Sequence, residues 1–323
     1  MTYCYYSPGS GTVPTPNPLG MPAGAVTVSG EPINAVVACD LGRAVVGVVN
    51  GVEAWRRSYP SIWPRAIEIF EGLLFVGDGT NIHVMNPATG FVHRTMAVPS
   101  APAAISGLSV TRYAGQSWVI CSFSGTGAGT VRGYTMSELA LTEAFVNPQT
   151  ASHPRHATLI GGWVFVADTF GHRVYGVTLG GAMRDSTEVY YPNHLQALAS
   201  DRIMVTAEHE NRVFVWDYSP THTREMVHCA PVAPFNDIAK TKADIVAGEG
   251  ATLDPASTFT PKKSLCAVEG SGANTLYSPN SSRLYGTDLL VADTDNHRVV
   301  LIRAGSVVST MTNLNNPVTA VLF

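Results

Sequence analysis

Two histidines in this chain lie at matching places in two similar stretches. His156 and His194 each come two residues after a proline that opens a short apolar run, in HPRHATLIGG (153–162) and YPNHLQALAS (191–200). Neutral imidazole nitrogens are common ligands of Zn²⁺. The pair therefore predicts a two-histidine metal site if the two stretches are neighbours in the fold. The alternative is a pair of structural histidines, because neither stretch offers a carboxylate at the matching position.

A second set of candidate functional residues consists of acidic side chains at the ends of short apolar runs. Asp168 and Asp293 occupy the same place in VADTFGHRV (166–174) and VADTDNHRV (291–299), nearly the same nine residues written twice. Weaker copies of the pattern add Asp40, Asp78 and Glu208. Such acids could form a cation site or a charged rim for a partner. We favour the alternative, that each acid caps its own turn and pairs with the arginine that follows it in three copies, because the acids recur with the repeat itself (Arg173, Arg212, Arg298).

The repeated nonapeptide predicts a strand, a tight turn and a second strand. An apolar run ends at the acid, small or polar residues follow, and a new apolar run begins after His-Arg. In three copies the first valine of the next strand comes six positions after the acid (Asp78 to Val84, Asp168 to Val174, Asp293 to Val299). His172 and His297 belong to this turn, so we expect both to be structural.

A proline that opens another short apolar strand precedes most of these hairpins. The prolines are 38, 52, 38, 87 and 38 residues apart (Pro64, Pro102, Pro154, Pro192, Pro279, Pro317). A more polar stretch such as TEVYY (187–191) or SVVSTM (306–311) follows each hairpin as a fourth strand. Four antiparallel strands in a unit of about 40 residues form one blade of a β-propeller. The sequence therefore predicts an all-β propeller.

The hairpins resemble NHL repeats, a family whose members form β-propellers. The resemblance covers residues 154–178 and 275–303 and rests on the VADTxxHRV hairpins and on DIVAGEG (244–250) before LYSPNSSRLYG (276–286). Peptidyl-hydroxyglycine lyases are similar propellers that hold zinc on three axial histidines, and this implies a metal at His156 and His194. In those lyases a histidine directly follows the proline at the blade entry, whereas in this chain it comes one residue later, and no third blade offers one unless His83 or His209 serves from a turn. Calcium on axial acids and Asn, as in lactonase-type propellers, has no matching motif here.

The two ends of the chain complete each other. Residues 317–323 supply a proline strand with no hairpin after it, whereas residues 35–59 supply a hairpin and an outer strand with no proline strand before them. We expect residues 317–323 to pair with the strand near residues 35–39 and close the ring without a free edge. This gives six blades in a single domain, residues 25–323, with residues 218–278 as an insertion or, alternatively, as a seventh blade.

Composition narrows the classes of partner. Charged residues make up 14% of the chain, against about 25% in an average soluble protein, and the net charge of −4 favours neither nucleic acid nor an anionic membrane. No apolar stretch reaches about 18 residues, so we expect no membrane span. The N-terminus lacks the basic start and apolar core of a secretory signal. The five cysteines show no CxxC spacing, and we expect buried free thiols.

These observations favour a non-catalytic structural propeller, a subunit of a larger assembly with other protein subunits or in a homo-oligomer, such as a phage-like virion or tail. No GxSxG, HExxH or phosphate-loop motif is present, so we expect no enzyme activity and no cofactor. Residues 1–24 form a Pro/Gly-rich arm whose Tyr3, Tyr5 and Tyr6 we expect to contact a partner. The alternatives are a metal-dependent lyase or hydrolase with zinc or calcium in the central channel, and a stand-alone NHL-type module that binds protein or glycan. The expected location is a virion or the cytoplasm.

Overall fold

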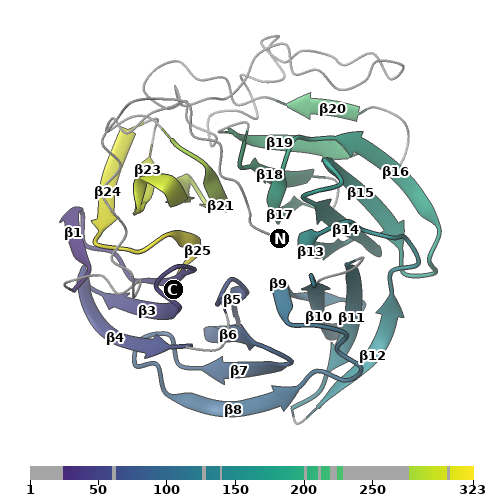
Figure 1. Ribbon diagram of the computed structural model, residues 1–323, viewed down its shortest axis with the longest axis horizontal. Helices are drawn as coiled ribbons and strands as arrows, with labels where there is room; N and C mark the ends of the chain where they lie inside the picture. Colours follow the sequence, from purple (N-terminus) through teal and green to yellow (C-terminus); the bar gives the residue numbers. More distant parts are fainter. Residues whose placement is uncertain are drawn as a thin grey trace.

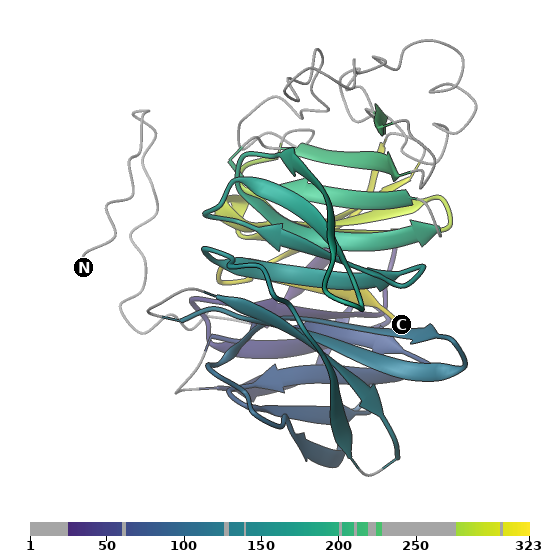
Figure 2. The same ribbon diagram turned by 90° about the vertical axis from the view of Figure 1, so that its right-hand side faces the viewer.

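Six four-stranded antiparallel blades surround a central axis in the described part of the chain, and a short additional strand joins two of them into one nine-stranded sheet (Figure 1). The computed structural model describes residues 25–59, 63–125, 129–138, 140–199, 202–209, 212–218, 224–227, 276–303 and 306–323. Figure 2 views the ring from the side, where the strands of each blade run between its two faces. The predicted all-β propeller is confirmed.

Each blade is a meander whose first strand lies nearest the axis. From the axis outward, blade 1 holds β25 (Pro317–Leu322), β2 (Ala35–Cys39), β3 (Ala44–Val49) and β4 (Val52–Ser58), and blade 2 holds β5 (Ile67–Phe70), β6 (Leu73–Asp78), β7 (Asn81–Met85) and β8 (Val92–Ala97). Blade 3 holds β9 (Ile105–Tyr113), β10 (Gln116–Phe123), β11 (Thr130–Met136) and β12 (Leu141–Val146). Blade 4 holds β13 (Pro154–Ile160), β14 (Trp163–Asp168), β15 (Arg173–Thr178) and β16 (Met183–Glu188). Blade 5 holds β17 (Pro192–Ala199), β18 (Arg202–Ala207), β19 (Arg212–Tyr218) and β20 (Arg224–Val227), and blade 6 holds β21 (Pro279–Tyr285), β22 (Asp288–Asp293), β23 (Arg298–Arg303) and β24 (Ser306–Thr312).

The number of blades follows from the innermost strands. They contact one another in the order β25, β5, β9, β13, β17 and β21, and β21 returns to β25. Because β17 and β21 are direct neighbours, six blades complete the ring. Most of residues 218–278, and the choice between an insertion and other structure there, lie outside the described residues.

Ring closure takes place in blade 1, as the sequence predicts. β25 pairs with β2 from Ala35↔Leu322 to Cys39↔Pro317, so the two ends of the described chain share one sheet. All five residues of β2 are buried. A strand buried on both faces needs hydrogen-bond partners at both of its edges, and β3 and β25 supply them.

A short strand that the sequence analysis did not predict reinforces this closure. β1 (Thr27–Gly30) pairs with β24 of blade 6 and touches β4 of blade 1 at Val52, so it joins the outer edges of two blades. Gly30 has a φ of +92°, and a Cβ there would lie 2.3 Å from the carbonyl oxygen of Val308. Only glycine fits this close approach without strain.

The hydrophobic core lies between neighbouring blades rather than at one centre. One cluster joins β2 and β3 to β22 and β23, another joins β6 and β7 to β9 and β10, and a third joins β10 and β11 to β13 and β14. Each middle strand is packed on both faces, and this explains why VFVA (164–167) and LLVA (289–292) are continuous apolar runs rather than alternating ones. A blade alone would expose both faces, so the blades are stable only as a ring.

The outer strand of blade 4 differs from the expected TEVYY. β16 ends at Glu188, and Tyr190 and Tyr191 lie in the loop that enters β17. Tyr191 has a φ of 53°, in the left-handed region, where an extended strand cannot continue. The two tyrosines are thereby placed on a face of the ring instead of its outer edge.

Three other sequence expectations can be placed. Cys39 and Cys121 are buried free thiols as predicted, and burial raises the pKa of Cys39 to about 12. Cys4, Cys229, Cys266 and the whole arm with Tyr3, Tyr5 and Tyr6 lie outside the described residues. In the described part of the chain, no helix has the length and apolar character needed to cross a bilayer.

Candidate functional site

A bulge at the start of four inner strands adds one residue that has no partner in the neighbouring strand. In β13, Pro154 pairs with Asp168 and His156 with Ala167, so Arg155 has no partner of its own in β14. The same irregularity recurs in β17, β21 and β25 and leaves Asn193, Asn280 and Val318 as the extra residues. Bulges of this kind redirect side chains near functional sites.

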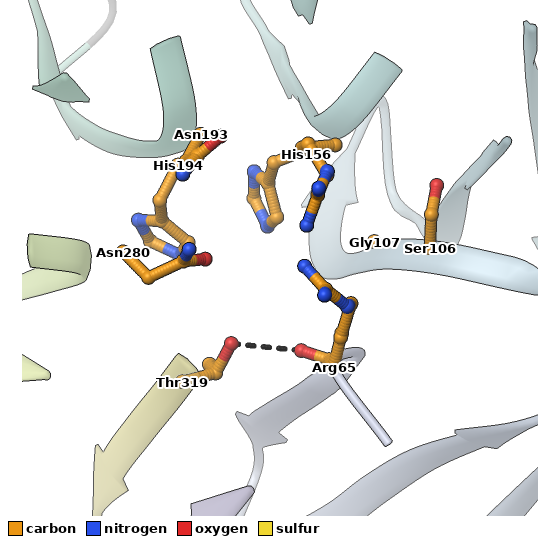
Figure 3. Close-up of a pocket in the computed structure, with 9 residues that line it drawn as sticks. Arg65, Ser106, Gly107, His156, Asn193, His194, Asn280 and Thr319 are labelled. Atoms are coloured by element: carbon orange, nitrogen blue, oxygen red, sulfur yellow. Dashed lines mark hydrogen bonds between the residues drawn. The ribbon is translucent and has the colours of Figure 1, made fainter. Parts of the chain in front are cut away.

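Three of these extra residues help to line a small cavity at one end of the central channel (Figure 3). The lining combines residues that follow the blade-opening prolines with two residues of β9 (Arg65, Ser106, Gly107, Arg155, His156, Asn193, His194, Asn280, Thr319). We call this space the channel-mouth cavity. It has room for about one water molecule, so a large substrate does not fit inside it.

The structure brings the two predicted histidines together in this cavity. The ring centroids of His156 and His194 are 4.3 Å apart, and both side chains are buried. They come from neighbouring blades 4 and 5, as the sequence predicted.

Both ring nitrogens of His156 are engaged by backbone. The Nε2–H donates to the carbonyl oxygen of Leu108 in blade 3 at 3.1 Å, and Nδ1 accepts from the backbone N–H of Leu195 in blade 5 at 3.4 Å. These bonds fix the Nε2–H tautomer of a neutral ring. Burial, together with the nearby charge of Arg283, lowers the pKa of His156 to about 3, although the hydrogen bond to the Leu108 carbonyl raises it. His156 therefore joins three consecutive blades.

His194 is different, because neither of its ring nitrogens has a hydrogen-bond partner of good geometry. The backbone of Ser282 lies close enough to raise the pKa of this ring somewhat, but burial, His156 and Arg283 outweigh it and hold the pKa well below the usual range. His194 is thus a neutral, buried imidazole with an uncommitted N–H.

These residues do not fit a metal ion well. His156 has no free nitrogen, and the guanidinium groups of Arg65 and Arg155 line the same cavity and oppose a cation. Among the described residues, no three His, Cys, Asp or Glu side chains gather in a metal-binding group. The arrangement favours the structural interpretation of His156.

The two strongest turn acids fasten their own turns to the loop that enters the same blade. Asp168 accepts from the backbone N–H groups of Ser152 and His153 at 2.8 and 3.0 Å, and from Arg173 Nε at 3.1 Å. Asp293 does the same in blade 6, with the backbone N–H of Tyr277 at 2.7 Å and Arg298 Nε at 2.7 Å. Both acids are fully buried. Neither acid lines the channel-mouth cavity.

The other three acids are also committed locally. Asp40 pairs with Arg65, Asp78 accepts from His83 Nε2–H at 2.9 Å, and Glu208 accepts from the side-chain amide of Asn193. Burial raises the pKa of Asp40 although Arg65 lowers it. The expected pairing of an acid with its adjacent arginine holds in blades 4 and 6, while the side chain of Arg212 lies outside the described residues.

The turn histidines occupy positions that need left-handed backbone. His172 and His297 have φ values of 50° and 52°, which histidine tolerates better than most residues. His172 also stacks on Tyr190, with ring centroids 4.7 Å apart. Neither histidine lines the channel-mouth cavity.

Sequence reasoning missed a buried ion pair across the ring. Arg283 of β21 donates to Glu68 of β5 at 2.8 and 3.0 Å and to the backbone oxygen of Ile67 at 3.2 Å. The partners are far apart in sequence and in non-consecutive blades, so no local pattern signals them. The only local sign is that Glu68 and Arg283 are charged residues inside predicted inner strands.

One face of the ring carries exposed apolar side chains next to the channel-mouth cavity. We call it the turn face; it holds the loops that enter the inner strands and the turns between second and third strands. Leu41, Trp63, Phe170 and Tyr190 lie in these loops and are 49%, 57%, 40% and 51% exposed. Leu41 and Trp63 belong to blades 1 and 2, opposite Phe170 and Tyr190 at blades 4 and 5 (Figure 1). Phe170 also packs against His153 and Tyr191, with centroids 4.6 and 5.7 Å away.

Comparison with known proteins shows the fold and no more. No protein-family model and no curated protein sequence matches the chain significantly. Among solved structures, a protein of unknown function from Bacteroides caccae is similar with a TM-score of 0.60 and 10% identity, over 90% of this chain and 98% of that one. A protein from Bacteroides fragilis, provisionally named a 6-phosphogluconolactonase, is similar with a TM-score of 0.54 and 12% identity, over 91% of this chain and 98% of that one. A functionally unknown protein from Desulfotomaculum acetoxidans is similar with a TM-score of 0.52 and 12% identity, over 92% of this chain and 88% of that one.

Proposed function

We propose that this chain is a non-catalytic structural propeller that assembles with copies of itself through its turn face, as a subunit of a larger body such as a phage-like virion or tail. The observation that carries the proposal is the placement of Leu41, Trp63, Phe170 and Tyr190, which are exposed on the same face of the ring. The four side chains form two pairs on opposite sides of this face, so they offer two separate apolar contact points, and exposed apolar surface is typical of protein contact sites.

Two further features support self-assembly without catalysis. The net charge of −4 and the low proportion of charged residues leave little repulsion between copies of the chain. His156 is engaged in holding neighbouring blades together, and Asp168 and Asp293 are engaged in fastening the turns of their own blades. A rigid ring with committed polar groups suits a scaffold better than an enzyme.

The test is the mass of the protein in solution over a range of concentrations, by light scattering. We expect the full chain to associate, and a Phe170→Ser, Tyr190→Ser double variant to remain monomeric. The matched control is Phe91→Ser, because exposed Phe91 lies in the turn between β7 and β8, the third and fourth strands of blade 2, on the opposite face. A wild type that stays monomeric at all concentrations, or a control that dissociates as fully as the test variant, overturns the proposal.

A second contact between subunits is expected from the arm formed by residues 1–24. We propose that Tyr3, Tyr5 and Tyr6 anchor it on an adjacent subunit, because aromatic residues supply much of the binding energy at protein interfaces. Deleting residues 1–24 should then lower the mass of the assembly. An unchanged mass would mean that the arm makes no contact between subunits.

The metal-dependent enzyme remains the rival to be tested. Its test is metal analysis of the purified protein and of a His156→Ala, His194→Ala double variant. Stoichiometric zinc in the wild type that is lost in the variant would contradict the non-catalytic proposal.

A further inference from the structure

The channel-mouth cavity contains a guanidinium group with no carboxylate partner. The Nε and Nη1 atoms of Arg155 are buried and make no hydrogen bond. No ion pair joins Arg155 to an acid anywhere in the described residues. A buried, charged donor without an acceptor is unfavourable unless a ligand or solvent pairs with it.

The other positive charges around the cavity are compensated. Arg65 pairs with Asp40, and Arg283 pairs with Glu68 at 2.8 Å. The carboxylate of Asp40 is thereby matched to Arg65 and does not neutralise Arg155. Among the described residues, Arg155 is therefore the charged side chain lining the cavity that has no ion-pair partner, in a partly buried environment where charges are poorly screened.

An independent group points to the same space. His194 is 3% exposed, lines the cavity, and has no good hydrogen-bond partner for either ring nitrogen. Figure 3 shows its ring and the side chain of Arg65 directed toward the space between the blades. Because His194 is held neutral by burial and by its neighbours, it offers one N–H donor to an acceptor in the cavity. The amide of Asn280 lines the same space.

The size and charge of the cavity restrict its ligand. Its space for about one water molecule is too small for a tetrahedral phosphate group but admits the end of a carboxylate. A cation is disfavoured by Arg155 and Arg65. Guanidinium groups bind carboxylates through short charge-assisted hydrogen bonds.

We propose that the channel-mouth cavity binds a single carboxylate group, with Arg155 as its ion-pair partner and His194 as a neutral hydrogen-bond donor. The proposal does not depend on self-assembly of the propeller. The carboxylate has two sources that share this chemistry, a free small acid or the C-terminal carboxylate of a peptide chain that docks on the turn face.

The test uses nuclear magnetic resonance saturation transfer and titration calorimetry on the full chain, with sodium acetate as the probe and sodium chloride at equal ionic strength as the reference. We expect acetate to bind and an Arg155→Gln variant to bind it about tenfold more weakly, because the ion pair is lost. The matched control is Arg112→Gln, since Arg112 is exposed, pairs with Glu71 at 2.5 Å, and does not line the cavity. Its affinity should match that of the wild type.

A second pair of probes separates the two sources. N-acetylglycine imitates a C-terminal carboxylate, and N-acetylglycinamide is the same molecule without the charge. Tighter binding of N-acetylglycine than of acetate indicates a peptide terminus, whereas equal or weaker binding indicates a free acid. If Arg155→Gln does not fold, His194→Phe replaces it and should also weaken acetate binding. Absence of acetate binding to the wild type, or equal binding by the wild type and the folded cavity variants, overturns the proposal.

Discussion

At the scale of single residues, the structure separates two histidines that the sequence presents as equals. His156 uses both nitrogens to hold blades 3, 4 and 5 together, whereas His194 keeps its nitrogens unpaired beside Arg155. The first is a structural histidine and the second is a candidate ligand donor. Both must stay neutral, because burial and Arg283 disfavour the imidazolium form.

This neutrality predicts that the fold loses stability in mild acid. Below the ordinary histidine pKa of 6.5, an unfolded chain takes up protons at both positions, while folded His156 stays neutral until the pH approaches about 3. The free energy of unfolding therefore falls as the pH falls below 6.5, by roughly 1 kcal/mol per pH unit for each histidine. Above pH 6.5 these two histidines do not change it.

Urea unfolding between about pH 6.5 and about pH 5 measures this slope before most carboxylates titrate. A His156→Gln, His194→Gln double variant should show a flatter dependence, whatever its absolute stability. A His93→Gln variant is the control, because His93 lies in the outer strand β8, away from the cavity. Equal slopes in all three proteins would contradict the neutral assignment.

At the scale of elements, the repeated unit is a hairpin tied to the loop that enters its own blade. The side chain of the turn acid makes this connection through hydrogen bonds, and their contribution to stability depends on how deeply the acid is buried. Asp168 accepts from two backbone N–H groups and from Arg173, whereas Asp78 is partly exposed and has one side-chain partner, His83.

Removal of these two acids should therefore have unequal costs. We expect Asp168→Ala to lower the free energy of unfolding by about 3 kcal/mol, because it leaves buried donors without acceptors. Asp78→Ala should cost less than about 1 kcal/mol. Urea denaturation of the two variants measures the difference, and similar losses would show that the turn acids do not act through buried hydrogen bonds.

At the scale of the whole molecule, the ring is held by contacts between residues that are distant in sequence. β25 completes blade 1, β1 joins the outer edges of blades 6 and 1, and the Arg283–Glu68 pair links blade 6 to blade 2. A propeller closed in this way unfolds as one unit, since no blade buries its apolar faces alone.

Deletion of residues 317–323 should abolish cooperative folding. It exposes one edge of β2 and removes the buried residues Val318, Ala320 and Val321, a loss comparable with the typical total stability of roughly 5–15 kcal/mol. Circular dichroism and thermal unfolding check the outcome. Deletion of Phe323 alone is the control and should leave a cooperative transition. A soluble truncated chain with the same transition would contradict closure through β25.

The sequence by itself determined the blades and the way the ring closes. Each blade is a run of consecutive antiparallel strands, so its turn acids, prolines and apolar runs lie close together in the chain and reveal it locally. The sequence also placed His156 and His194 on neighbouring blades, because each follows the proline that opens one of two consecutive blades. Equivalent positions in such blades face the same channel.

Only the tertiary structure decided what those positions do. The bulge that directs Arg155 into the cavity, the bonds of His156 to Leu108 and Leu195, and the charge of Arg283 all depend on how one blade packs on the next. Glu68 and Arg283 meet only because the ring closes. Such contacts join residues whose separation in sequence is unrelated to the repeat, so no local pattern encodes them.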